Sequence, residues 1–396
     1  MFKLFYNFDT QTRLFFIATG MMGLSNGIFD AVYNFYLKAN GIDEVGIGQI
    51  YAISMLMMSS AVIVLMIASI KISAKKILIG SSVIYALPFL ALPFCTTVYS
   101  CSVALGLILS GMIAILSTGN SLFGLRVGDN KTKMFGLFFV FYLGAAMLAS
   151  FIVAIITKYS PFSSIYNYKS VLLIAFISAA LMVIVRLKSI HGVKEFSNNK
   201  IHKQAKYNLE WRNLAMLFIA SFLLGGSITL IFRFANILFN QAYSLDVTET
   251  SVVFGFDKIV SIFGALCAPL LVKKYNIMIT LLSIGILTFL TLISQSFYLP
   301  LAIFIILYFG RLILNYALMP LLDTLTISGF DKSRVLISSS TRQLSFYFGG
   351  ACSAILYGWL FQNHDWVKAL IYSALMALAG VTALFFVKES SKSEVQ

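Results

Sequence analysis

A carboxylate and two carboxamides recur at four-residue intervals within the first apolar run of the chain. Asn26, Asp30 and Asn34 drift by about 40° per step on a helix, so they share one face. Gly23 and Gly27 border this face, and small residues beside polar ones indicate contact with protein or water rather than lipid. The spacing therefore predicts a polar stripe that faces the interior of a helical bundle.

The seventh apolar run carries a similar stripe of Thr229, Arg233, Asn236 and Asn240. A shift of 203 residues brings Asp30 onto Arg233, which predicts that the two charges lie at equivalent depths in facing helices. Two roles are open to Asp30. A dry cavity favours its protonated form and a nearby cation favours its charged form, so Asp30 could take up and release a proton. Alternatively, Asp30 and Arg233 form a fixed ion pair that locks an outer gate.

Arg311 lies near the middle of the tenth apolar run, and Tyr308 and Asn315 share its helical face. A charge at this depth is costly, so it needs a partner. Arg311 either holds an anionic group of a substrate or neutralises a carboxylate from the other half of the chain.

Other charges within the runs have structural or gating interpretations. Asp257 and Lys258 lie toward the outer end of the eighth run, and their side chains point about 100° apart. We therefore expect Asp257 to form an interhelix salt bridge, with Arg233 as a candidate partner. Three charges near the inner ends of their runs are assigned to an inner gate: Arg126, Asp323 and Arg342.

The chain has 36 phenylalanines and 19 tyrosines. Most of these rings face lipid or pack between helices, but several tyrosines lie next to the charges above. An aromatic cavity with few charges suits an amphipathic solute better than a sugar, whose hydroxyl groups need many polar partners. The tyrosines expected to line such a cavity are Tyr33, Tyr142, Tyr308, Tyr316 and Tyr347.

Composition indicates that lipid surrounds these residues. Of 396 residues, 59% are hydrophobic and 11% are charged, against about 25% charged in soluble domains. A span needs about 20 apolar residues. Twelve runs qualify, which predicts an all-α membrane protein: 14–37, 46–70, 77–94, 101–125, 135–157, 170–187, 213–239, 251–272, 277–297, 300–326, 335–360 and 367–387.

The net charge of +14 lies mostly in alternate short loops, such as Lys71 to Lys76 and Lys273 to Lys274. This distribution follows the positive-inside rule and predicts a multi-pass protein of the cytoplasmic membrane with both termini in the cytoplasm. It does not resemble the basic face of a nucleic-acid-binding domain. A basic linker at 188–212 divides the chain into six-span bundles at 1–187 and 213–396.

The two halves look like copies, because Gly41-Ile42-Asp43 matches Ser244-Leu245-Asp246 at the same shift. Internal repeats are typical of secondary transporters. With six spans on each side of a basic linker, the chain resembles the major facilitator superfamily. The family's signature loop, Gly-x-x-x-Asp-(Arg/Lys)-x-Gly-(Arg/Lys)-(Arg/Lys), is reduced at 69–76 to its positive charges. The resemblance implies two pseudo-symmetric bundles around a central cavity.

These observations favour a monomeric secondary transporter that exports a small amphipathic solute, such as a drug, a peptide-like antibiotic or a metabolite, driven by protons. The alternative is a nutrient uptake symporter of the same fold. A lipid flippase or scramblase, or an intramembrane enzyme, fits less well, because the three histidines lie in loops or near run ends. No cofactor or metal motif is present. The sequence leaves open whether Cys95 and Cys101 form a disulfide.

Overall fold

A computed structural model describes residues 5, 8–124, 131–160, 164–190, 211–328 and 335–387. In these ranges the regular structure is entirely helical, and twelve helices are long and apolar enough to cross a membrane. The first six are α2 (Thr10–Ala39), α3 (Glu44–Lys71), α4 (Ala74–Ala91), α5 (Val98–Gly124), α6 (Lys131–Tyr159) and α7 (Ser164–Ile190). The second six are α8 (Trp211–Arg233), α10 (Val247–Lys274), α11 (Ile277–Gln295), α12 (Leu301–Ser328), α13 (Val335–Gln362) and α14 (Trp366–Leu384).

The predicted spans agree with these helices in number and order, so the predicted fold class is confirmed. Two of the predicted runs are not single α-helices. The third closes with a short 3-10 turn at Leu92–Phe94, where Pro93 cannot donate an amide hydrogen bond. The seventh is interrupted after Arg233 and continues as the separate helix α9 (Ala235–Tyr243).

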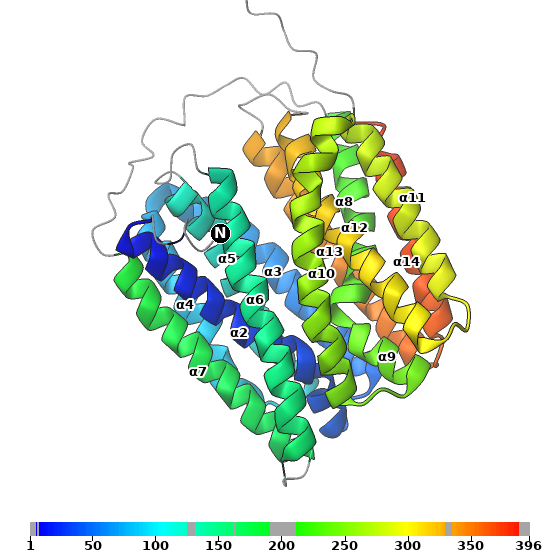
Figure 1. Ribbon diagram of the computed structural model, residues 1–396. Helices are drawn as coiled ribbons and strands as arrows, with labels where there is room; N and C mark the ends of the chain where they lie inside the picture. The colour runs from blue at the N-terminus through cyan, green and yellow to red at the C-terminus, as the bar shows by residue number, and fades with distance from the viewer. Residues whose placement is uncertain are drawn as a thin grey trace, which may run out of the picture.

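The helices pack as two groups that lie side by side (Figure 1). In the first group α2 packs on α6 and α7, and α5 packs on α3 and α4. In the second, α8 packs on α13 and α14, and α12 packs on α10 and α11. The pairs α3–α13 and α6–α10 join the groups. The predicted linker spans 188–212, of which 191–210 lie outside the described residues, so the domain boundaries there stay a prediction.

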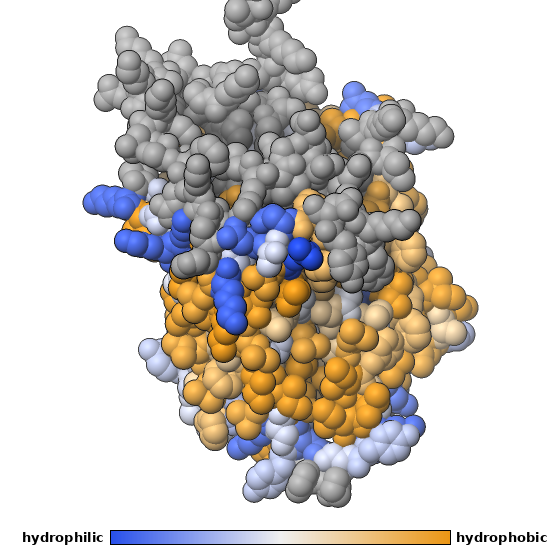
Figure 2. All heavy atoms as spheres, turned by 60° about the vertical axis from the view of Figure 1, so that its left-hand side comes forward, coloured by the Kyte–Doolittle hydropathy of each residue, from blue (hydrophilic) through white to orange (hydrophobic). Residues whose placement is uncertain are grey.

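On the face seen in Figure 2, apolar side chains cover the middle of the molecule, and hydrophilic side chains gather above and below this belt. Large exposed side chains such as Leu87, Ile155, Ile177 and Ile306 belong to spanning helices. Such surface cannot face water at low cost. The belt therefore marks the part of the protein that lipid covers. We name the end of the molecule at Asn40–Asp43 the outer end, following the predicted orientation.

The repeat is visible in local geometry at the outer end. Gly41 and Ser244 both adopt left-handed backbone conformations, with φ of 80° and 57°. Asp43 and Asp246 then cap α3 and α10, each accepting a backbone N–H bond three residues on, from Gly46 and Glu249. The predicted match between these two segments, 203 residues apart, is confirmed.

Deeper in the bundles the repeat has a different register. Gly23 lies against the backbone of Tyr142, and Gly225 lies against the backbone of Phe346 in the same way. Gly23 therefore corresponds to Gly225, at a shift of 202 residues, and not to Gly226. The shift changes from 202 to 203 between Gly225 and Ser244, and the helix break falls in this interval. The second half holds one extra residue there.

Candidate functional site

Opposite charges from the two groups of helices meet at Lys258 of α10. Its ammonium lies 3.2 Å from the carboxylate of Asp257 and 3.8 Å from that of Asp30 on α2. Asn26, one turn before Asp30, donates a hydrogen bond of 3.1 Å to the same carboxylate. Tyr308 of α12 donates to Asp257 at 3.3 Å. Two carboxylates therefore share one ammonium across the boundary between the groups.

The pairing differs from the sequence-based expectation for Asp30. Arg233 forms no ion pair with a carboxylate among the described residues, and its guanidinium instead lies 5.7 Å from the centre of the Tyr51 ring. The physical reason is the register of the repeat. At a shift of 202 residues Asp30 corresponds to Phe232, and the next position on a helix points about 100° away.

Asp257 also pairs differently, because its neighbour Lys258 is the partner instead of Arg233. The two Cα–Cβ bonds diverge, but the flexible stem of a lysine lets its ammonium turn back toward the preceding side chain.

A second polar cluster seals the outer end at the break between α8 and α9. In an unbroken helix the N–H of Ile237 would donate to the carbonyl of Arg233. Here the side chain of Asn236 accepts from Ile237 at 3.0 Å, and Asn34 of α2 donates to the Arg233 carbonyl at 2.7 Å. Asn34 also donates to Asn236 at 2.6 Å and accepts from Tyr51 at 2.8 Å. Asn34 therefore satisfies the backbone group that the break frees.

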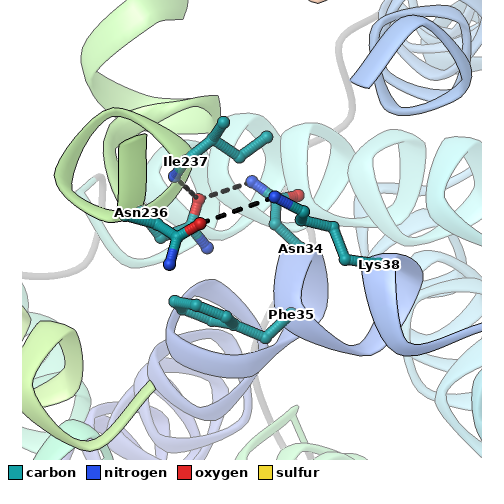
Figure 3. Close-up of a pocket in the computed structure, with 6 residues that line it drawn as sticks. Asn34, Phe35, Lys38, Asn236 and Ile237 are labelled. Carbon is teal, nitrogen blue, oxygen red and sulfur yellow. Dashed lines mark hydrogen bonds between the residues drawn. The ribbon is translucent and has the colours of Figure 1, made fainter. Parts of the chain in front are cut away.

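Further contacts extend this seal across the outer end. Beside it lies a small pocket, in which the side chains of Asn34 and Asn236 point toward each other (Figure 3). The residues that line it are Asn34, Phe35, Lys38, Asn236, Ile237 and Asn240. Gln241 donates to Glu44 at 3.4 Å and to the Phe361 carbonyl at 2.7 Å. At this end the two groups of helices are joined by hydrogen bonds from side-chain amides, and the expected Asp30–Arg233 ion pair is not formed among the described residues.

The helices α3 and α13 also approach closely at the outer end. A Cβ added to Gly48 would lie 2.6 Å from the carbonyl of Ala354 and 3.0 Å from the Cα of Gly358. Any larger residue at Gly48 would push the two helices apart. This crossing holds the two groups together beside the polar seal.

Arg311 of α12 is 1% exposed. Its guanidinium lies 5.7 Å from the centre of the Tyr308 ring, one turn away on the same helix. Asn315 is also buried on this helical face. No carboxylate of the described residues pairs with Arg311.

The predicted cavity residues are only partly brought together. Tyr33 is 1% exposed and packed between the rings of Phe29 and Tyr51, so it does not border an opening. Thr229 donates to the Gly225 carbonyl of its own helix. Tyr142 of α6 and Tyr347 of α13 are half-buried, but the two are not equivalent in the repeat, since Tyr142 corresponds to Phe346.

Asp323 and Arg342, both assigned to an inner gate, form a hydrogen-bonded ion pair. The pair joins α12 to α13, within one group of helices, and therefore does not bridge the groups. Arg126, the third predicted gate residue, lies outside the described residues.

Three important residues were missed by sequence reasoning. Lys258 was treated as an ordinary salt-bridge residue, although a lysine within an apolar run was the available signal. Tyr51 had no signal, since one tyrosine among many cannot be distinguished by type. Arg186 of α7 is 1% exposed and stacks 5.0 Å from the centre of the Phe15 ring. Its position within an apolar run was a signal that went unused.

The four cysteines are free thiols. Cys95 lies in the outer loop after α4, where partial burial raises the pKa of its thiol. Within the described ranges no group of three or more His, Cys, Asp or Glu side chains could hold a metal ion.

Residues 15–334 match the model of the Major Facilitator Superfamily. The chain belongs to this superfamily. Its members are secondary transporters rather than enzymes, so a small-molecule substrate and a lipid bilayer are the expected partners. No curated protein sequence matches the chain.

Solved superfamily structures share the fold over nearly the whole chain. The nucleoside transporter NupG has a TM-score of 0.72 at 16% identity, covering 96% of this chain and 99% of its own. An auto-inhibited peptide transporter of the POT family has a TM-score of 0.77 at 11% identity, covering 98% and 99%. The fucose:proton symporter FucP of E. coli has a TM-score of 0.66 at 14% identity, covering 96% and 98%. At these identities the likeness establishes the fold alone.

Proposed function

We propose that this superfamily member couples proton movement to the transport of a small amphipathic organic solute, with Asp30 as the group that gains and loses the proton. The observation that carries this proposal is the charge cluster of Asp30, Lys258 and Asp257 between the two groups of helices. Its carboxylates belong to different groups, so any movement of one group against the other changes their distances to the shared ammonium.

Charge balance supports this role. With both carboxylates ionised the three groups carry a net charge of −1, which the charge of Arg233 near Asp30 offsets in part, and one proton makes the three groups neutral by themselves. An uncompensated charge within the bilayer is costly, which favours proton uptake whenever the cluster is closed off from water. Two strongly interacting carboxylates titrate as a pair, so one proton can serve both.

Accessibility favours Asp30 over Asp257 as the exchanging group. The side chain of Asp30 is 19% exposed, whereas that of Asp257 is 5% exposed. The outer seal at Asn34 closes the path toward the outer end, so the proton would exchange with the inner side in this conformation. Opening the seal would move that exchange to the outer side, as alternating access requires.

Direction remains part of the proposal. Half-buried tyrosines such as Tyr142 and Tyr347 suit an amphipathic solute, which is consistent with export. A second candidate is nutrient uptake, because the fold-related FucP is described as a fucose:proton symporter and NupG as a nucleoside transporter. Transport measured in everted and in right-side-out vesicles under an imposed pH gradient distinguishes export from uptake.

The coupling role is tested with Asp30→Asn in reconstituted vesicles. We expect substrate-driven proton flux to fall at least about tenfold, because an amide cannot carry the proton. Exchange of labelled for unlabelled substrate, which needs no net proton movement, should persist. Asp365→Asn is the matched control, since Asp365 pairs with Lys368 at the surface. Unchanged proton flux in Asp30→Asn would remove this residue from the coupling step.

The partner assignment is tested by exchanging the two charges. Asp30→Lys alone and Lys258→Asp alone should each abolish transport, and the double variant should recover part of it. If Asp30→Arg with Arg233→Asp recovers transport and the Lys258 exchange does not, Arg233 is the functional partner and the cluster assignment is wrong. We expect a monomer to be the transporting unit, because Asp30, Lys258 and Asp257 all belong to one chain.

A further inference from the structure

Arg311 is a buried cation without an anion. None of its three guanidinium nitrogens donates a hydrogen bond to any atom in the described part of the chain. Buried polar groups nearly always find a partner, and a buried cation left alone is far more costly than a neutral group. The missing partner of this arginine needs an explanation.

The surroundings of Arg311 are aromatic and amide groups rather than acids. Its guanidinium lies over the Tyr308 ring, which stabilises a cation through the face of the ring without neutralising it. Asn315, one turn on, makes no hydrogen bond within the described residues. Arg311 and Asn315 therefore present unused donors from one helical face.

Arginine is well suited to bind an oxyanion. Its planar guanidinium donates two parallel hydrogen bonds to a carboxylate or a phosphate, and such bonds are stronger than those between neutral groups. An aromatic ring beside the cation offers a surface for the apolar part of the same molecule. The site therefore fits a molecule with both an anionic group and an apolar body.

We propose that Arg311 binds the anionic group, a carboxylate or a phosphate, of the transported solute, which makes the substrate an amphipathic organic anion. This inference rests on the proposed transport function and narrows its substrate. Tyr308 connects the two sites, because its ring contacts Arg311 while its hydroxyl donates to Asp257. Binding of an anion at Arg311 thereby acts on the group that shares Lys258 with Asp30.

Arg311 is enclosed in this conformation, so an anion reaches it only when the helices around it move. A chain of contacts links the Arg311 site to the outer end of α2. Tyr308 packs against Phe239 of α9, with ring centres 5.0 Å apart, and α9 is held to α2 through Asn34 and Asn236. Opening the outer seal therefore loosens the wall of the Arg311 site.

The test uses purified protein and three probes of one shape: 2-naphthoate, 2-naphthyl phosphate and the uncharged 2-naphthamide. We expect at least one of the anions to raise the thermal unfolding midpoint of the wild-type chain, with little effect from the amide. Comparison of the two anions tells a carboxylate site from a phosphate site. Arg311→Gln should weaken anion binding at least about tenfold, because hydrogen bonds to a charged group are lost.

Two further variants keep the test decisive. Arg186→Gln removes the other enclosed, unpartnered arginine and should leave anion binding unchanged. Arg311→Lys keeps the charge but loses the two-pronged geometry, so it should bind the anion with intermediate strength even if Arg311→Gln fails to fold. The proposal is overturned if neither anion stabilises the wild type, if the amide stabilises it equally, or if Arg311→Lys binds as tightly as the wild type.

The proposal for the anion site and the proposal for the proton site can be contradicted independently. Asp30→Asn should still bind the anionic probe in preference to the uncharged amide, while losing coupled proton flux. Anion binding that survives in this variant upholds the Arg311 site even where the proton-coupling proposal fails. Anion selectivity that survives in Arg311→Gln, together with intact proton flux, would locate the substrate anion elsewhere and overturn the Arg311 assignment.

Discussion

At the scale of single residues, Asn34 makes the hydrogen bonds that join the two groups of helices at the outer end. It is 2% exposed, donates to a carbonyl of the other group of helices, and accepts from Tyr51. A hydrogen-bonded amide that is removed from a buried site leaves its partners unpaired, at about 1–3 kcal/mol for each group. Asn34 therefore stabilises the conformation in which the outer end is closed.

Replacement of Asn34 by leucine should open the outer end. In a background without the four native cysteines, Ile237→Cys beside the pocket reports access from outside through its reaction with a membrane-impermeant maleimide. We expect Asn34→Leu to speed this reaction about tenfold, since about 1.4 kcal/mol shifts the closed–open equilibrium by that factor. Asn363→Leu is the control, because the exposed Asn363 side chain, just after α13, donates to the Trp359 carbonyl of that helix and not to the other group of helices. Equal labelling rates in both variants would contradict the role of Asn34.

At the scale of helices, the break between α8 and α9 explains why one stripe of polar residues was read correctly and its counterpart was not. Asn26, Asp30 and Asn34 do lie on one unbroken helix, α2. Arg233 and Asn236 belong to different helices, because Phe234 is turned into an aromatic cluster, stacked 5.6 Å from Phe361. The extra residue between Gly225 and Ser244 changes the direction in which the side chains of α8 point relative to those of α9.

The crossing of α3 and α13 gives a second helix-scale prediction. Gly48→Ala should weaken closure of the outer end, since its Cβ would lie 2.6 Å from the Ala354 carbonyl. The same Ile237→Cys report should show faster labelling, together with a lower unfolding temperature. Gly80→Ala is the matched control: a Cβ there has open space, and alanine favours a helix by up to about 1 kcal/mol over glycine. A neutral result at Gly48 would show that the helices can separate there without cost.

At the scale of the whole molecule, membrane insertion fixes which ends of the helices meet water on each side. The positive-inside distribution predicts that the linker at 188–212 is cytoplasmic. This orientation also decides which side the seal at Asn34 closes, and so the meaning of every gate described above.

Labelling tests this orientation directly. A cysteine at Ser197, in the linker, should react with an impermeant maleimide in everted vesicles and stay unreactive in intact cells. A cysteine at Tyr298, which is 86% exposed in the loop between α11 and α12, should show the reverse pattern. If both cysteines react in intact cells, the predicted count of crossings between them is wrong.

Part of this protein is determined by its sequence alone. Twelve apolar runs, their order, and the matching caps at Asp43 and Asp246 follow from local composition and spacing, because a helix in lipid must satisfy its own backbone. The same reasoning finds Asp30 and Arg311, since a charge in an apolar run is rare and costly.

Which charges meet was decided by the tertiary structure. Lys258, not Arg233, reaches Asp30, and Arg311 is left without an anion among the described residues, because one residue of register turns a side chain by about 100°. Spacing along a chain cannot reveal a break that is stabilised from another helix, as Asn34 does for the Arg233 carbonyl. Pairing across a bundle depends on how whole helices pack, and that information lies in contacts between residues far apart in sequence.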